Sequence, residues 1–279
     1  MPRSSAIGGG GGGGDDRLRI TYVGHATLLL EMAGVRILTD PNFDPRLARF
    51  LPRVSPPGIA LEELPRLDAI LLTHAHADHL SFASLDALPR AVPLYAPPVV
   101  ARWLARRGYG NALPLAPDES VKVGPVEITA GAARHMGARY AVDRWRSAAN
   151  MYLMADRSST CFFAGDTALS ADGRRIVEER LPASGRGSLD VALLPIGHAP
   201  WWKRAAFRRG HLTPGDALTL FEALGAKFFI PYHWGTFRHV TSGPYQAIRE
   251  LRSDLERHHR RADVRILEPG SSFELDGAA

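Results

Sequence analysis

The segment Thr73–Leu80 concentrates side chains that can bind a metal ion. It places three histidines and one carboxylate within six positions, at His74, His76, Asp78 and His79. Residues two apart do not share a helix face, so His74 and His76 could meet at one ion only from an extended or turning loop. Imidazole nitrogen and carboxylate oxygen suit Zn²⁺, Mn²⁺ or iron. The alternative is a polar surface loop whose histidines occur together by chance.

Four further ligand-type residues each follow a predicted strand. They are Asp40 after the strand 35–39, His135 beyond 126–129, Asp166 after 160–164 and His233 after 227–230. In α/β folds, functional residues gather at the carboxyl ends of strands. Taken singly, each has an ordinary interpretation, a turn residue for Asp40 and a hydrogen-bonded polar residue for either histidine. Their shared placement favours one common site with the 74–79 segment.

Short strands separated by helices would have to position these residues. The strands expected from apolar runs and turn residues are 18–23, 27–32, 35–39, 68–73, 121–123, 126–129, 150–154, 160–164, 191–195, 227–230, 264–267 and 272–275. Helices are expected at 98–107, from Thr213 to a stop at Gly225, and at 245–259 with Ile248, Leu251 and Leu255 inward. This alternation predicts a layered α/β domain.

The chain shows one compositional boundary. The run Gly8–Gly14 has no side chains to bury, so residues 1–17 are expected to form a disordered leader. With no further linker or internal repeat, residues 18–279 are expected to form a single domain. No run approaches the roughly 20 apolar residues that span a bilayer, and no secretory signal is recognisable.

Charge and cysteine content narrow the setting. The formal charge is +5 and the isoelectric point about 9.6, which favours an anionic substrate, although arginines on solvated faces explain the same numbers. Cys161 is the single cysteine, so no intrachain disulfide can form, as expected of a cytoplasmic protein. Because Cys161 lies in an apolar run, we expect it in the core rather than as a nucleophile.

The order of these motifs resembles the metallo-β-lactamase superfamily. His-x-His-x-Asp-His is followed by an isolated histidine, a Gly-Asp pair and a final histidine. The stretches 24–27, 39–41, 163–167, 194–197 and 233–237 are similar to the branch that contains N-acylphosphatidylethanolamine-hydrolysing phospholipase D. The resemblance covers essentially everything from Leu18 onward.

The resemblance implies an α/β fold, a four-layer αββα sandwich of mixed sheets, with two metal ions at one edge. Carried over by position, one metal would take His74, His76 and His135, the other would take Asp78, His79 and His233, and Asp166 would bridge them. Asp40 matches a family aspartate near the metals and would orient a ligand histidine. Zinc is the expected metal, with manganese or iron as alternatives.

The implied chemistry is hydrolysis. Two cations about 3.5–4 Å apart would hold a bridging hydroxide that attacks in line. Asp78 would orient this hydroxide or accept its proton. The predicted substrate is a phosphodiester, with an N-acyl phosphatidylethanolamine-like phospholipid as a candidate. A lactonase or amidase is the alternative, because the same hydroxide attacks carbonyls.

Basic and aromatic residues after the strand 191–195 would overhang the site. Trp201, Trp202, Lys203 and Arg204 could bind an anionic amphiphile or touch a lipid headgroup layer, which would make the protein peripheral to a membrane. The alternative is a solvated basic loop with its tryptophans packed beneath it. His198 and His211 are candidates for substrate contact or leaving-group protonation, with His211 preferred. A second substrate rim is expected at 144–146.

Two other classes of function remain open. The basic isoelectric point would allow a nucleic-acid-processing nuclease, but the long RNA-gripping arm of such relatives has no counterpart here, so nucleic acid is not the expected partner. A metal-binding scaffold without activity is disfavoured by the intact set of ligands. Oligomeric state has no signal in the sequence.

Overall fold

The computed structural model describes residues 17–47, 50–140, 142–145, 147–182, 185, 187–238 and 243–275. The expected leader lies outside these ranges except for Arg17, as does Arg146 of the second predicted rim.

Two mixed sheets form the centre of the molecule. The first runs in the order β15 (Ser272–Leu275), β1 (Leu18–Gly24), β2 (Thr27–Met32), β3 (Val35–Thr39), β6 (Ala69–Leu71), β7 (Leu94–Ala96), β8 (Ala112–Pro114). The second runs β14 (Phe228–Tyr232), β13 (Val191–Pro195), β12 (Thr160–Phe163), β11 (Asn150–Ala155), β10 (Val126–Ala132), β9 (Ser120–Val123). A small ribbon joins β4 (Arg46–Leu47) to β5 (Leu51–Pro52).

The first sheet is buried on both faces because its strands are apolar on both faces. In β2, Leu28 and Leu30 pack into the main core, while Leu29 packs into a second core on the opposite face. In β6, Leu71 belongs to the main core and Ile70 to the second. Side chains alternate across a strand, so this near-continuous apolar pattern requires a layer on each side.

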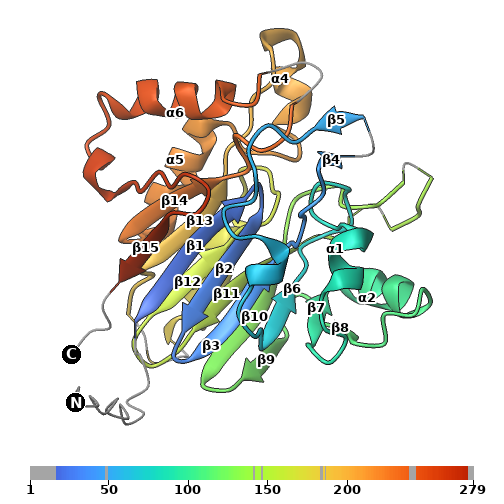
Figure 1. Cartoon of the computed structure of the whole chain (residues 1–279). Coiled ribbons are helices and arrows are strands. Elements are labelled where there is room, and N and C mark those ends of the chain that lie inside the picture. The colour runs from blue at the N-terminus through green and yellow to red at the C-terminus, as the bar shows by residue number, and fades with distance from the viewer. Residues whose placement is uncertain are drawn as a thin grey trace, which may run out of the picture.

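Helices supply the outer layers. Over the first sheet lie α1 (Phe82–Ala87) and α2 (Pro98–Ala105); with the second sheet lie α3 (Asp172–Arg180), α5 (Pro214–Leu224) and α6 (Gln246–Leu255). Figure 1 shows α1 and α2 on one side of the paired sheets, and α5 and α6 on the other. The expected αββα sandwich is therefore confirmed.

The helix expected from Thr213 is confirmed with both ends as predicted. The Thr213 hydroxyl accepts from the backbone N–H of Asp216, and the Asp216 carboxylate accepts from Thr213, which makes a capping box. Gly225 ends α5 in the left-handed region, at φ 62°. The other two expected helices form but end early, at Ala105 and Leu255.

The expected strand 264–267 is wrong. Only Val264 pairs, in an isolated bridge to Phe229 of β14. The chain must then cross to the other sheet, because β15 pairs with β1. A strand over 264–267 would keep the chain beside β14 in the second sheet, whereas the chain has to reach β1 in the first sheet by Ser272.

The alternative interpretation of residues 200–204 as a basic loop is also wrong. Trp201–Phe207 form a short helix, α4, with Pro200 in an extended conformation directly before its first turn. Among the described residues, no helix combines the length and apolar character needed to cross a membrane.

Candidate metal centre

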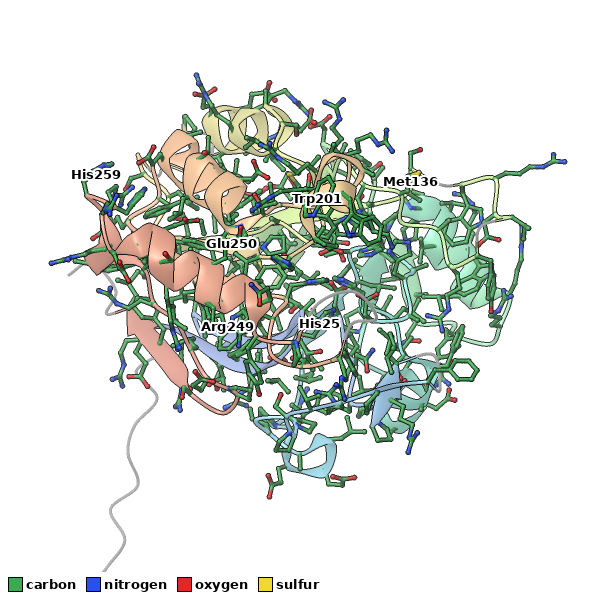
Figure 2. The ribbon with its side chains drawn as sticks, turned by 90° about the horizontal axis from the view of Figure 1, so that it is seen from above. His25, Met136, Trp201, Arg249, Glu250 and His259 are labelled. Atoms are coloured by element: carbon green, nitrogen blue, oxygen red, sulfur yellow. The ribbon has the colours of Figure 1, made fainter. Side chains whose placement is uncertain are left out.

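The ligand-type residues gather at one edge of the two sheets. Asp40 follows β3, the 74–79 segment follows β6, His135 follows β10, Asp166 follows β12 and His233 follows β14. Figure 2 views the molecule from above, onto the side where His25, Met136 and Trp201 are labelled. Segments up to 193 residues apart in sequence thus supply one site, by subtraction of position 40 from position 233.

Three histidines form the first cluster. His74, His76 and His135 each offer one nitrogen, and these nitrogens lie within 4.8 Å of one another. His76 Nδ1 and His135 Nε2 are 3.1 Å apart. Two nitrogens bound to one tetrahedral zinc ion would be about 3.3 Å apart. This three-histidine cluster therefore has the spacing of ligands that share an ion.

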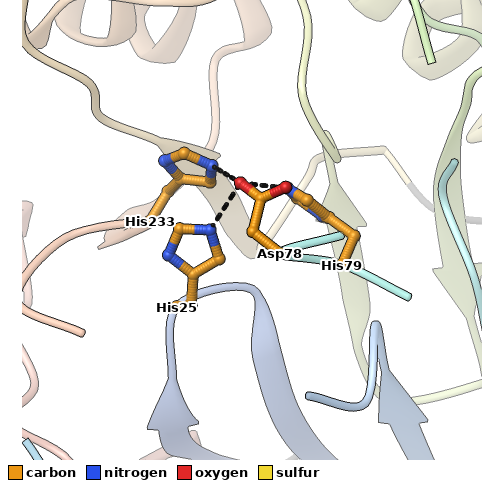
Figure 3. Close-up of side chains that lie close together, drawn as sticks. All are labelled: His25, Asp78, His79 and His233. Atoms are coloured by element: carbon orange, nitrogen blue, oxygen red, sulfur yellow. Dashed lines mark hydrogen bonds and ion pairs between the residues drawn. The ribbon is translucent and has the colours of Figure 1, made fainter. Parts of the chain in front are cut away.

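Two carboxylates and two histidines form a second cluster, the carboxylate cluster. Asp78 Oδ2 lies 3.5 Å from His233 Nε2 and 3.8 Å from His79 Nε2 (Figure 3). Asp166 Oδ2 lies 3.4 Å from each of the same two nitrogens. His74, His79 and Asp166 also offer three donor atoms within 4.8 Å of one another. Asp166 therefore lies between the two clusters.

Several nitrogen and oxygen atoms that could bind a metal ion are buried in these clusters without a hydrogen-bond partner. They are His74 Nε2, His79 Nε2, His233 Nε2 and Asp166 Oδ1. Each unsatisfied buried polar atom costs about 1–3 kcal/mol, so proteins do not gather them at random. Elsewhere in the described chain, only Asn111 Oδ1 is in the same condition. The residues fit bound metal ions, which would satisfy all four atoms of the clusters at once.

Asp40 orients the histidines of both clusters. Its Oδ2 accepts from His79 Nδ1 at 2.7 Å and from the Thr73 hydroxyl at 2.6 Å. The Thr73 hydroxyl in turn lies 2.9 Å from His74 Nδ1. These bonds place a proton on the Nδ1 of each ring and leave each Nε2 as the donor that faces the clusters.

Hydrogen bonds to backbone carbonyls position His135 and the loop of Asp166. His135 Nδ1 donates to the carbonyl of Gly210 at 2.7 Å, which leaves its Nε2 facing His76. The Tyr232 hydroxyl donates to the carbonyl of Gly165, the residue before Asp166. Gly165 has φ +59°, and an added Cβ would lie 2.8 Å from Thr73 Cγ2. Only glycine fits this approach of the Asp166 loop to the 74–79 segment.

Strained backbone is concentrated at this edge. His25, Asp40 and His233 have positive φ angles of 57°, 35° and 71°. The left-handed region costs a residue with a Cβ about 1–3 kcal/mol and persists where the surrounding structure enforces it. Each of these residues lies at a strand end and has its side chain in the carboxylate cluster or hydrogen-bonded to it.

The two clusters differ in the charge of their side chains. Burial lowers the pKa of His74 well below its usual value and that of His135 to about 4, so the three-histidine cluster is neutral. Burial alone would raise the pKa of Asp78 and Asp166, but the neighbouring histidines hold both pKa values well below the usual range. The same carboxylates overcome burial and raise the pKa of His233 to about 9. The carboxylate cluster thus requires positive charge, which protons or a metal cation can supply.

A pocket of about 170 Å³ opens beside the carboxylate cluster. Its lining includes Asp78, His211 and His198, with apolar walls from Phe207 and Trp234. His211 Nε2 lies 3.6 Å from Asp166 Oδ2, and its ring stacks on Phe207 with centroids 4.6 Å apart. The structure thus brings both of these histidines, expected to contact substrate, to the pocket wall.

The tryptophans of α4 project into solvent. Trp201 is 87% exposed and Trp202 is 58% exposed. The alternative that they pack beneath a basic loop is therefore wrong. Two large apolar side chains are thus exposed next to each other at the start of α4.

The cations of α4 are less available than the sequence suggests. Arg204 pairs with Glu250 of α6, which also accepts from His198 Nδ1 at 3.0 Å. Lys203 Nζ lies 4.8 Å from the centre of the Trp202 ring. The predicted basic surface is thus partly neutralised, and Glu250 links α4 to the pocket.

Sequence reasoning assigned no role to His25, Thr73 or Glu250. Of these, His25 contacts a predicted metal ligand directly through a carboxylate, with its Nε2 3.0 Å from Asp78 Oδ2. It stands in one of the stretches that carry the family resemblance, Gly24–Thr27, and that signal could have marked it. Thr73 and Glu250 act through hydrogen bonds to histidines, which leave no recognisable spacing.

Known proteins share both the sequence pattern and the fold. An N-acyl-phosphatidylethanolamine-hydrolyzing phospholipase D from Caenorhabditis elegans is 28% identical over 253 residues, which are 84% of this chain and 68% of the relative. A metal-dependent hydrolase from Methanopyrus kandleri is 29% identical over 262 residues, which are 92% of this chain and 100% of that protein.

Two solved structures share the fold at lower identity. A metallo hydrolase from Ignicoccus hospitalis has a TM-score of 0.68 at 22% identity and covers 94% of this chain and 100% of its own. A diiron β-hydroxylase from Streptomyces venezuelae has a TM-score of 0.64 at 20% identity and covers 94% of this chain and 54% of its own.

A family model also matches most of the chain. Residues 35–234 match the model of the beta-lactamase superfamily domain, and this range includes every residue of the two clusters. His25 lies outside it. With most of its length and both clusters inside the match, the chain belongs to the beta-lactamase superfamily and is a metal-dependent hydrolase.

Proposed function

We propose that this protein is a two-metal hydrolase that cleaves a phosphodiester. The observation that carries the proposal is the set of four buried donor atoms without partners, on His74, His79, His233 and Asp166. They belong to two adjacent clusters rather than one, and Asp166 lies between them. This arrangement supports two ions, one for each cluster.

The first ion would take His74, His76 and His135. The second would take Asp78, His79 and His233, with Asp166 shared. When bound, the two ions would acidify a water between them and neutralise charge on the phosphoryl oxygens. Zinc is the proposed metal because nitrogen ligands predominate, while the fold is shared with a diiron enzyme, which makes iron the first alternative.

The chain's own residues orient the reaction. Asp40 and Thr73 hold the rings of His79 and His74 with their donor nitrogens toward the centre. Asp78 faces the pocket and would hold the attacking water or accept its proton. His211 lines the same pocket with its Nε2 3.6 Å from Asp166 Oδ2 and would protonate the leaving oxygen.

A phospholipid is the proposed substrate class. Support comes from the phospholipase D relatives and from the exposed tryptophans of α4, the helix that also carries pocket-lining Phe207. Trp201 and Trp202 would enter a headgroup layer while the chain remains peripheral to the bilayer. A cytoplasmic location is proposed with this, in keeping with a single, fully buried thiol at Cys161.

A substrate panel tests the proposal. The purified protein would be assayed on bis-p-nitrophenyl phosphate, N-acyl phosphatidylethanolamine, a homoserine lactone and a β-lactam. We expect hydrolysis of the first two and loss of that activity with a chelator. Hydrolysis of the lactone alone would reject the phosphodiester and favour a carbonyl substrate.

A further inference from the structure

His25 is the least expected member of the site. It lies in the turn between β1 and β2, and its side chain is 7% exposed. The family match begins ten positions later, at residue 35, by subtraction. The proposed ligand set already gives each ion its protein ligands without His25, so its presence calls for a role of its own.

The backbone of His25 joins the turn to the loop that carries His233. Its N–H donates to the Thr236 hydroxyl at 2.7 Å, and its carbonyl accepts from the N–H of His233 at 2.9 Å. Both bonds are made with φ at +57°, a conformation in which histidine, asparagine and aspartate are enriched. The hydrogen bond to His233, which lies 208 positions later in the sequence, helps to keep His25 in this strained conformation.

Ring contacts fix the direction of the His25 side chain. Its ring lies against that of His233 with centroids 3.9 Å apart, and Phe237 approaches its edge at 5.3 Å. The ring therefore has little freedom to turn. Figure 3 shows the result: the rings of His25, His79 and His233 converge on the Asp78 carboxylate.

His25 differs from the other two rings in what it contacts. His79 and His233 each lie within 4 Å of both Asp78 and Asp166, as ligands around one ion would. Among the carboxylates of the described chain, His25 comes within 4 Å of Asp78 alone, and at 3.0 Å this is the shortest of the three contacts to Asp78. That geometry is the one of a hydrogen bond to a ligand rather than of a further ligand.

We propose that His25 is a positioning residue, whose Nε2–H holds the Asp78 carboxylate in place for the second metal ion. The inference rests on the proposed two-metal function. Asn42 Nδ2 holds the backbone at this position, since it donates to the carbonyls of Ala77 and Asp78 at 2.9 and 3.1 Å, but these bonds do not fix the carboxylate. His25 supplies the restraint on the carboxylate itself.

Two substitutions separate positioning from ligation. In His25→Gln, the amide N–H can replace Nε2–H, whereas His25→Leu fills similar space without a donor. Arg174→Leu is the control, since the Arg174 side chain is 56% exposed on α3 and lies outside every group of candidate metal ligands. Each metal-free protein would be titrated with Co²⁺, following bound metal by elemental analysis and the visible absorption of each ion.

We expect His25→Leu to bind the first ion as the unaltered protein does and the second about 10–100-fold more weakly. His25→Gln should keep most of that second affinity with the same visible spectrum, and Arg174→Leu should match the unaltered protein. Normal binding of the first ion also shows that each variant has folded.

Two results would overturn the proposal. One is a second ion held by His25→Leu as tightly as by the unaltered protein. The other is His25→Gln losing the second ion as His25→Leu does, with a changed spectrum, which would make His25 a direct ligand. Failure of the two-metal function is distinguishable, because the unaltered protein would then not take up a second ion at all.

Discussion

Asp40 is the residue on which the geometry of both clusters depends. Its Oδ2 accepts hydrogen bonds from His79 Nδ1 and from the Thr73 hydroxyl, and that hydroxyl in turn contacts His74 Nδ1. Its Oδ1 accepts from the N–H of Thr73 at 2.7 Å. Its side chain is completely buried. A single carboxylate thus fixes a ligand of each proposed ion, and its loss should affect both.

Asp40→Asn is expected to weaken metal binding about 10–100-fold. In one orientation, the amide turns its N–H toward His79 Nδ1, which is itself a donor. In the other orientation, it offers His79 a neutral oxygen, which is a weaker acceptor than the carboxylate. Dissociation constants measured by competition with a chelator would report the change. Asp68→Asn is the control, because Asp68 accepts from the backbone of Arg36 away from the site. Unchanged affinity in Asp40→Asn would contradict the orienting role.

At the residue scale, the sequence predicted what lies close together in the chain. His74, His76, Asp78 and His79 occupy one short segment, so their types and spacing alone indicated a metal site. His25 could not be found in this way. Its relation to Asp78 depends on the β1–β2 turn and the loop after β6 meeting at one edge of the first sheet, which the spacing of residues in the chain does not encode.

Helix α5 begins with the capping box of Thr213 and Asp216, directly after His211. The Asp216 carboxylate also pairs with Arg208, which ties the end of α4 to the start of α5. Burial would raise the pKa of Asp216, but hydrogen bonds from Arg208 and Thr213 lower it below its usual value. This cap therefore couples the stability of α5 to pH.

Asp216→Asn is expected to cost about 1 kcal/mol of unfolding free energy at neutral pH. Because the folded-state pKa of Asp216 is depressed, its contribution is present above the unfolded pKa of about 3.9 and is lost as pH falls below it. Urea unfolding of both proteins at pH 7 and below pH 4 would measure this. A difference that stays constant with pH would contradict the assignment.

Helix α4 presents its tryptophans outward, so their loss should alter binding rather than folding. The double change Trp201→Ala with Trp202→Ala is expected to shift stability by no more than about 0.5 kcal/mol. It should raise KM for a phospholipid in vesicles and leave hydrolysis of bis-p-nitrophenyl phosphate unchanged. If the variant and the unaltered protein had the same KM on vesicles, α4 would have no role in lipid binding.

At the element scale, local signals predicted α5 from end to end but missed α4. Thr213, Pro214 and Gly225 are strong start and stop residues. Helix α4 has no side-chain cap at Pro200 and no buried residue, so its segment lacks the start residue and the apolar face that predict a helix. The missing strand at 264–267 failed for another reason: the chain has to cross between sheets there, which is a property of topology rather than of local sequence.

The whole molecule is a frame that brings distant loops to one edge. Strands β3 and β6 run parallel in the first sheet, and β12, β13 and β14 run parallel in the second. Their carboxyl ends meet, which is why residues spread along the chain form one site. The sequence predicted this arrangement through the family resemblance, whereas apolar patterning alone predicted only a layered α/β domain.

Metal removal is expected to destabilise the whole molecule. Bound ions stabilise the folded state because they bind it in preference to the unfolded chain. Without them, the buried carboxylates keep only the protons on His79 and His233 as neighbouring positive charge. A chelator should therefore lower Tm in a thermal scan, and adding zinc back should restore it. An unchanged Tm after complete removal of metal would contradict this.

The number of metal ions per chain tests the central claim most directly. The account requires two, because the buried donor atoms without partners belong to two clusters joined by Asp166. Elemental analysis of the purified protein, dialysed against metal-free buffer after loading with zinc, should give close to two ions per chain. His76→Ala should reduce that number. A ratio of one or less in the unaltered protein, or full metal content in His76→Ala, would contradict the account.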